Sequence, residues 1–111
     1  IPEKEKQAGL MIREYKKRRD YMLKRLRTMG ITAPTPDGAF YIFANIAKDS
    51  VVFSNTLLEE AHVAVVPGAA FGDNACIRMS FTIPLPRICE GMDRLEKFIA
   101  ASSSPIPPRR Q

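Results

Sequence analysis

The sequence predicts a two-layer α+β sandwich, in which helices cover one face of a small, mostly antiparallel sheet. Long segments with apolar residues three and four positions apart indicate amphipathic helices, and three short apolar runs bounded by turn residues indicate strands. Their order along the chain is helix, strand, helix, strand, strand, helix. We expect the helices to cover one face of the sheet and the other face to be open to a partner.

A long first helix is predicted over residues 3–29. Basic residues occupy most of its surface, and an apolar stripe recurs at helical spacing at Met11, Tyr15, Met22, Leu26 and Met29. Gly30 is expected to end the helix, because glycine adopts the left-handed conformation at no steric cost. The prolines in residues 33–38 then predict extended and turn geometry.

Strands are predicted at residues 39–44, 63–66 and 76–81. The first follows a turn signal, is rich in aromatic and β-branched residues, and is too apolar for an exposed edge strand. The second is a short run of valines and alanine that we expect to be buried. The third carries Arg78 at its middle.

Two further helices complete the predicted fold. Asp49 or Ser50 can cap the second helix, which has Glu59 and Glu60 facing water and a buried stripe of Phe53, Leu57, Leu58 and Ala61. The third begins near Pro84 and Pro86, and its apolar stripe comprises Leu85, Ile88, Met92, Leu95 and Ile99.

The 111 residues, 12.4 kDa in mass, suit one compact domain, which we place at residues 1–101. Residues 102–111 are rich in serine and proline and predict a disordered tail. The chain starts at Ile1 rather than Met, and no basic-then-apolar leader follows, so we expect that sequence upstream is missing. No apolar run approaches the ~20 residues needed to span a bilayer.

Charge is concentrated in the first helix. Residues 1–29 contain 10 of the 17 basic residues and 4 of the 12 acidic ones. Such a helix can bind nucleic acid or an acidic membrane, although a solvated face, or one against an acidic partner domain, is more common. Cys76 and Cys89 lack metal-site spacing and are interpreted as reduced thiols of a cytoplasmic protein, with a disulfide between them as the alternative.

Arg78 is the most informative residue for function. A guanidinium in the middle of an apolar strand loses hydration unless a carboxylate or phosphate binds it. Its planar fork binds a carboxylate through two parallel hydrogen bonds, which Lys cannot reproduce. The residues alone are equally compatible with an ion pair to Asp73 or Glu60, or with a place for Arg78 on the solvent face.

Other polar or glycine-rich positions give weaker signals. The loop from Gly68 to Gly72 could present amides to an anion, but its spacing matches no phosphate-binding motif, and a simple strand connection is favoured. His62, the only histidine, lacks the companions of a catalytic triad and is expected at a helix end or in packing. Phe40 and Tyr41 are most simply core and sheet-surface residues.

Three segments together resemble a known family. The sequences PDGAFY at 36–41, LLEEAHVAVVPGAAFG at 57–72 and IRMSF at 77–81 look like the C-terminal signature of class I/II aminotransferases. The preceding helix, with Tyr15, Arg18, Arg19 and Asp20, resembles the family helix that leads into the small domain. The likeness covers residues 9–100, and its specificity lies in the combination and order of the pieces.

The resemblance implies that the chain is the C-terminal small domain of a fold type I, aspartate aminotransferase-like enzyme that uses pyridoxal phosphate. Arg78 then matches the arginine that binds the substrate α-carboxylate, and Gly38 and Phe40 border the substrate pocket. The small domain is expected to close over amino acid and 2-oxo acid substrates and exclude water. The full-length protein is expected to be a homodimer.

The same resemblance implies that essential parts lie outside the chain. The Schiff-base lysine and the groups that hold the cofactor belong to the large domain, and no residue here matches them. We therefore expect no catalytic, cofactor-binding or metal-binding residue in this chain, and no activity from it in isolation.

Two alternatives remain at this point. The full protein could perform a related pyridoxal reaction, such as an elimination or a synthase step, in which Arg78 would serve equally. The chain could instead be a free-standing binding module that holds nucleic acid with its basic helix, through residues 16–19 with Lys24, Arg25 and Arg27; such binding would weaken steeply with salt.

Overall fold

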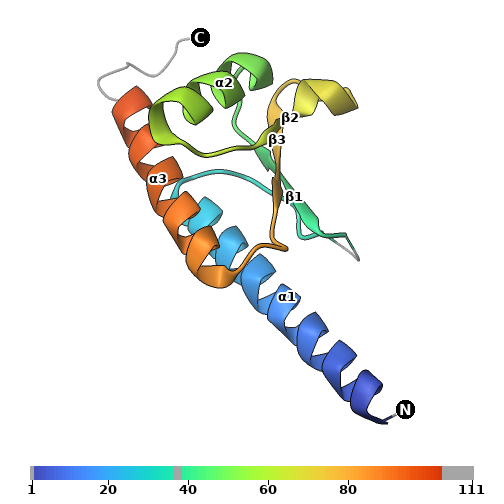
Figure 1. Ribbon diagram of the computed structural model, residues 1–111. Helices are drawn as coiled ribbons and strands as arrows, with labels where there is room; N and C mark the ends of the chain where they lie inside the picture. The colour runs from blue at the N-terminus through green and yellow to red at the C-terminus, as the bar shows by residue number, and fades with distance from the viewer. Residues whose placement is uncertain (1, 37–38, 104–111) are drawn as a thin grey trace.

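The computed structural model describes residues 2–36 and 39–103. Three α-helices, a short 3₁₀ helix and three strands follow one another in the order α1, β1, α2, β2, η1, β3, α3 (Figure 1). Their bounds are Pro2–Thr28 (α1), Tyr41–Asn45 (β1), Ser50–Ala61 (α2), Val66–Pro67 (β2), Gly68–Phe71 (η1), Cys76–Ser80 (β3) and Leu85–Ser103 (α3).

The sheet is antiparallel, with the strand order β1-β3-β2. Tyr41 pairs with Ser80 at one end of the β1–β3 ladder and Asn45 with Cys76 at the other. The prediction that residues 39–44 avoid the sheet edge is wrong, because β3 is central and β1 is an edge strand. One end of this edge is covered by residue 32, where the Asn45 N–H donates to the Thr32 carbonyl at 2.8 Å.

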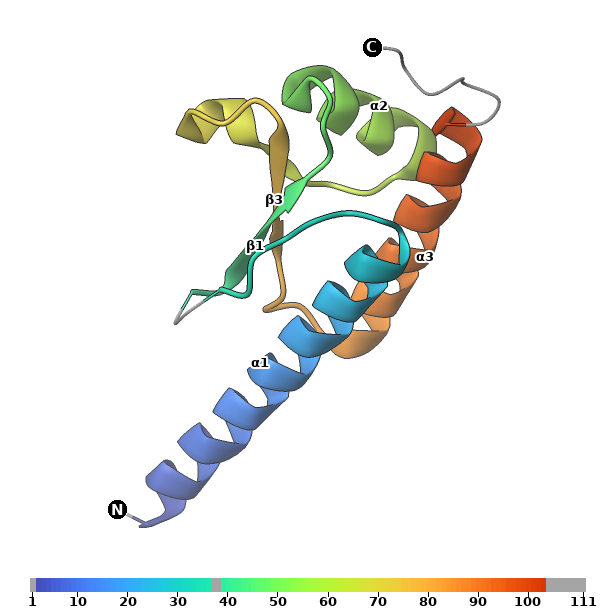
Figure 2. The ribbon, with the colours of Figure 1, turned by 180° about the vertical axis from the view of Figure 1, so that it is seen from behind.

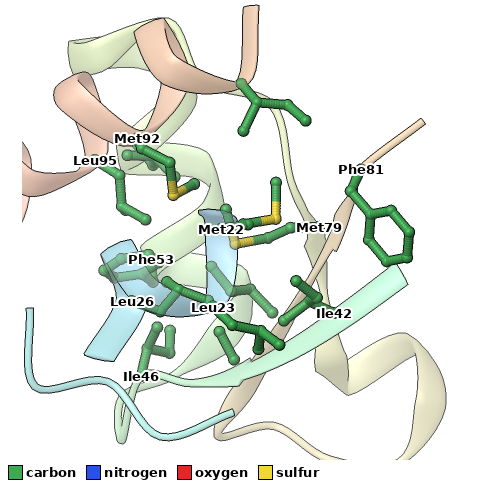
Figure 3. Close-up of a cluster of buried hydrophobic side chains, with 14 residues drawn as sticks. Met22, Leu23, Leu26, Ile42, Ile46, Phe53, Met79, Phe81, Met92 and Leu95 are labelled. Atoms are coloured by element: carbon green, nitrogen blue, oxygen red, sulfur yellow. The ribbon is translucent and has the colours of Figure 1, made fainter. Parts of the chain in front are cut away.

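The three α-helices lie on one side of the sheet, as predicted (Figure 2). Alternate residues of β1 and β3 point toward them, and the core in Figure 3 joins these strands to all three helices. Its fully enclosed members include Leu26, Ile42, Leu57, Ile77 and Leu95. The opposite sheet face bears no helical layer in the described part of the chain.

The predicted first helix is confirmed as α1, and only its second half is packed. Met22, Leu23 and Leu26 are buried in the core. The first half extends away from the other elements (Figures 1 and 2), so Met11, predicted to belong to the apolar stripe, is 51% exposed beside Leu10 and Ile12.

Helix α2 begins as predicted but buries a different set of side chains. The Asp49 carboxylate caps it by accepting from the Val51 and Val52 N–H groups, each at 3.0 Å. The buried face consists of Ser50, Phe53, Ser54 and Leu57, which share the i, i+3, i+4, i+7 spacing. Leu58, predicted to be buried, falls outside this face and is 53% exposed.

The second predicted strand is largely wrong. Of residues 63–66 only Val66 is in a strand, β2, and it continues into Pro67. Ala64 is exposed, and Val63, Val65 and Val66 are partly buried. Pro67 has no N–H to donate to a ladder, and β2 accordingly is a short edge strand.

The predicted last helix is confirmed, with Ile88, Met92 and Leu95 in the core and Leu85 and Ile99 packed against it. It runs through Ser103, two residues into the segment predicted as a tail, and residues 104–111 lie outside the described part. Within the described residues, no helix has the length and apolar character required to cross a membrane.

Candidate functional site

Arg78 lies on the open face of the sheet, in the middle of the central strand. Its register partners are Phe43 on β1 and Val66 on β2. Because side chains alternate along a strand, Arg78 points away from the helices while its neighbours Ile77 and Met79 are buried against them. The sheet therefore presents the Arg78 guanidinium at the centre of the face opposite the helices.

The guanidinium has no anionic partner within the described residues. Its Nε atom is buried and makes no hydrogen bond there. Asp73, one of the two acids considered from sequence, instead accepts from the Ala75 N–H at 3.1 Å and the Cys76 thiol at 3.3 Å. No described ion pair joins Arg78 to Asp73 or Glu60. Within the described residues no acid balances the charge of Arg78, which makes its guanidinium the candidate group for binding an external anion.

Aromatic rings surround Arg78 on this face. The centre of the Tyr41 ring lies 4.2 Å from the Arg78 Cζ atom, and that of the Phe71 ring 4.5 Å. Phe43 meets Phe71 edge to face, with 6.0 Å between ring centres. All three rings remain 39–47% exposed. Tyr41 was expected on the sheet surface, but no contact between these rings and Arg78 was predicted.

A shallow hollow of about 170 Å³ adjoins the guanidinium. Its lining comes from β1, β3 and the segment leading into β2: Tyr41, Ala64, Val65, Val66, Arg78 and Ser80. Arg78 is the only charged residue of this lining. The arrangement suits a small molecule that ends in a carboxylate and has an apolar body.

The other predicted substrate-binding residues are not brought to Arg78 by described contacts. Gly38 lies outside the described residues. Phe40 precedes β1, is 48% exposed, and packs edge to face against Tyr15 of α1 at 5.3 Å and Phe81 at 6.4 Å between ring centres. Its predicted place at the border of a substrate pocket stays a prediction.

The Gly68–Phe71 segment forms η1, which connects β2 to β3 as the favoured interpretation predicts. Ser50, at the start of α2, is hydrogen-bonded to this segment. Its hydroxyl accepts from the Ala69 N–H at 3.0 Å and donates to the Asn74 side-chain oxygen at 2.8 Å. These bonds hold η1 against the start of α2 and thereby place Phe71 over Arg78.

His62 ends α2, in agreement with its predicted helix-end role. Its backbone is left-handed, with φ 60°, and its N–H donates to the Leu58 carbonyl at 3.1 Å. The His62 carbonyl in turn accepts a longer bond, 3.4 Å, from Arg94.

Both cysteines are free thiols, as predicted. Burial raises the pKa of the Cys76 thiol, and its bond to the Asp73 carboxylate raises it further. A raised pKa disfavours the thiolate that a nucleophile or metal ligand requires. The described residues contain no cluster of three or more side chains of the kind that hold a metal ion.

The basic face of α1 is partly neutralised. Arg18 pairs with Glu14 and Arg19 with Asp20, at 2.9 and 3.0 Å, and Arg25 pairs with two acids of α3. The exposed cations of this helix that remain without a described ion pair include Lys16, Lys17, Lys24 and Arg27.

The similarity to known proteins extends over nearly the whole domain. The sequence model for aminotransferase class I and II matches residues 2–95. The chain belongs to this family. It is 40% identical over 89 residues to an aspartate aminotransferase of Thermotoga maritima, and 44% identical over 97 residues to a probable N-acetyl-LL-diaminopimelate aminotransferase of Bacillus subtilis.

These matches cover 80% and 83% of the chain but 24% and 25% of the two relatives. The chain thus spans about a quarter of the length of the curated aminotransferases it matches. Two solved structures also share its fold: an aromatic aminotransferase from Pyrococcus horikoshii, with TM-score 0.84, 39% identity and 88% and 28% of the two chains covered, and an aminotransferase from Mycobacterium tuberculosis, with TM-score 0.85, 30% identity and 91% and 28% covered.

The family is generally dependent on pyridoxal phosphate, and the described residues of this chain place no lysine at the hollow to anchor that cofactor. A covalent cofactor anchor requires a lysine near the reacting centre. The lysines described lie along α1, at Lys48 and at Lys97, and none of them lines the hollow beside Arg78. The described residues therefore place one candidate anion-binding group, Arg78, beside the hollow, and no described lysine in its lining.

Proposed function

We propose that this chain is the C-terminal small domain of a pyridoxal-phosphate-dependent aminotransferase that transfers an amino group between an amino acid and a 2-oxo acid. Within that enzyme Arg78 binds the substrate α-carboxylate. The observation that carries the proposal is the Arg78 guanidinium, which lines the hollow on the open face of the sheet and has no described ion pair. The relatives from Thermotoga maritima and Bacillus subtilis are both named as aminotransferases, which supports the reaction class.

The guanidinium offers what a carboxylate needs. Two parallel N–H donors on one edge of its plane match the two oxygens of the acid, and charge-assisted bonds are worth about 1.5–3 kcal/mol each. Held in this way, the carboxylate fixes one end of the substrate and orients its amino or carbonyl carbon away from the small domain. Both substrates of a transamination carry this carboxylate, so one arginine can serve both half-reactions.

The remaining parts of the proposal concern the whole protein. The cofactor and its lysine belong to the large domain, so the isolated chain is expected to be inactive. Closure of the small domain over the substrate would exclude water, with Gly38 and Phe40 at the border of the pocket. We expect a cytoplasmic homodimer, and the two free thiols fit a reducing compartment.

A matched pair of variants in the full-length enzyme tests the assignment. Arg78→Leu removes the guanidinium of the open face, and Arg94→Leu removes one from the surface of α3, where Arg94 pairs with Glu90. Losing a bidentate, charge-assisted carboxylate contact should raise the substrate KM at least tenfold in Arg78→Leu. Arg94→Leu should leave KM unchanged, and an unchanged KM in Arg78→Leu would overturn the proposal.

A further inference from the structure

The rings of Tyr41 and Phe71 hold the Arg78 guanidinium in a way that an acidic neighbour would not. Each ring centre lies within 4.5 Å of Cζ, closer than in the other two arginine–ring contacts of the described chain, which are 5.5 Å for Arg18 on Tyr15 and 5.7 Å for Arg25 on Tyr21. Those two arginines also have carboxylate partners, whereas Arg78 has none described. Among these three arginines, Arg78 is thus the one whose described side-chain contacts are with aromatic rings and not with a carboxylate.

Rings and carboxylates stabilise an arginine with different consequences. A carboxylate occupies the N–H donors and cancels the charge. An aromatic face attracts the cation through its quadrupole and leaves the donors on the guanidinium edge available for an incoming anion. Ring contacts thus keep the arginine ordered and charged without occupying its N–H donors.

The two rings are themselves fixed by the fold, from different elements. Tyr41 is placed by the β1–β3 ladder, where it pairs with Ser80, two residues from Arg78. Phe71 closes η1, which Ser50 ties to the start of α2, and its ring packs edge to face on Phe43. The guanidinium thus contacts one ring from a strand and one from a helical turn, and both of these elements are held by described contacts.

We propose that Tyr41 and Phe71 are positioning residues that pre-orient Arg78 for the substrate carboxylate. This inference rests on the proposed function of Arg78. The rings restrict the rotation of a long side chain before substrate arrives, so less conformational entropy is lost on binding. Both rings act through Arg78 on the carboxylate, and because Tyr41 also lines the hollow, a substrate without a carboxylate is needed to separate this effect from direct contact.

Substitutions at Tyr41 in the full-length enzyme separate the ring from the rest of the side chain. Tyr41→Phe keeps the ring, and Tyr41→Leu removes it while keeping an apolar residue on β1. We expect Tyr41→Leu to raise KM for the amino acid and for the 2-oxo acid about tenfold while kcat changes less than twofold. Tyr41→Phe should restore KM to within twofold of the wild type, and Phe71→Leu should behave as Tyr41→Leu does.

Two further measurements distinguish a positioning effect on Arg78 from a general loss of structure. The melting temperature of each variant reports folding, and the rate of reaction with a primary amine lacking the α-carboxylate reports the rest of the active site. If Tyr41→Leu slows the amine as much as the amino acid, Tyr41 acts on the general structure and the inference is wrong.

The test also distinguishes failure of this inference from failure of the proposed function. A raised KM in Arg78→Leu, together with an unchanged KM in Tyr41→Leu and Phe71→Leu, would overturn the positioning role alone. An unchanged KM in Arg78→Leu would remove the proposed function, and the positioning role with it.

Discussion

The guanidinium of Arg25 on α1 bonds the carboxylate of Glu96 on α3 at 2.8 Å. The same group reaches the Asp93 carboxylate at 2.9 Å and donates to the Tyr21 hydroxyl at 2.6 Å. Residues 71 positions apart in sequence are thereby joined, and the link ties the packed half of the first helix to the last one.

We predict that Arg25→Leu destabilises the domain by about 1–2 kcal/mol. The Arg25 side chain is 18% exposed, but its two acidic partners are 64% and 52% exposed and regain water when it is removed, which limits the loss. Arg19→Leu, which removes an ion pair within α1, serves as the control and should change the free energy of unfolding by less than about 0.5 kcal/mol. Urea unfolding of both variants tests this, and equal losses would contradict it.

A second prediction concerns Gly68 at the start of η1. A Cβ atom at this position would overlap the backbone carbonyls of Asp73 and Cys76, which cannot move without disturbing β3. Gly68→Ala should therefore cost about 1–3 kcal/mol or more, as overpacked sites do.

The matched control for this prediction is Gly91, which lies within α3 and has open space around the corresponding position. Gly91→Ala should stabilise the domain by about 0.5–1 kcal/mol, because alanine favours helix. Thermal unfolding of the two variants should thus give shifts of opposite sign, and two shifts of the same sign would refute the overlap predicted at Gly68.

A third prediction concerns pH. Hydrogen bonds lower the pKa of Asp49: the Val52 N–H has the largest effect, and the Asn74 side chain and the Val51 N–H add to it. A carboxyl group with a lowered folded-state pKa stabilises the fold above its ordinary pKa of about 3.9, and this stability is lost as pH falls below that value.

Asp49→Asn keeps a capping side chain and removes the titration. The stability of the wild type relative to Asp49→Asn should accordingly be constant near neutral pH and decrease as pH falls from about 5 to about 2. Urea midpoints of the two proteins across this range provide the measurement, and a pH-independent difference would show that the cap carries no charge effect.

The helices and the central strand could be predicted because their signals are local. The stripe of α3 repeats along the whole helix, and the arginine in 76–81 stands out against apolar neighbours. The errors concern tertiary placement. The aromatic content of β1 suggested a covered strand, whereas Tyr41 and Phe43 line the open face of an edge strand.

The choice between Leu58 and Ser54 could not be made from hydrophobicity either. The burial face of α2 is set by where α3 and η1 lie, and the small Ser54 falls on it while Leu58 does not. Apolar character predicts burial only when the direction of the core is known.

Part of the candidate site could be predicted from the sequence. Arg78 followed from the cost of placing a charge in an apolar strand. Tyr41 and Phe43 share its sheet face by strand alternation, so their proximity could have been inferred once β1 was paired with β3. The position of Phe71 could not have been inferred in this way. A 3₁₀ helix of four residues places its ring over Arg78, and such a short helix has no periodic sequence pattern.

The most direct test of the central claim is the discrimination of the full-length enzyme between an amino acid and the matching amine without the α-carboxylate. The quantity to measure is kcat/KM for the amino acid divided by kcat/KM for the amine, in the wild type and in Arg78→Leu. If Arg78 binds the α-carboxylate, the ratio should fall at least tenfold in Arg78→Leu, with the amine value little changed. A ratio equal to that of the wild type would contradict a carboxylate-binding role for Arg78.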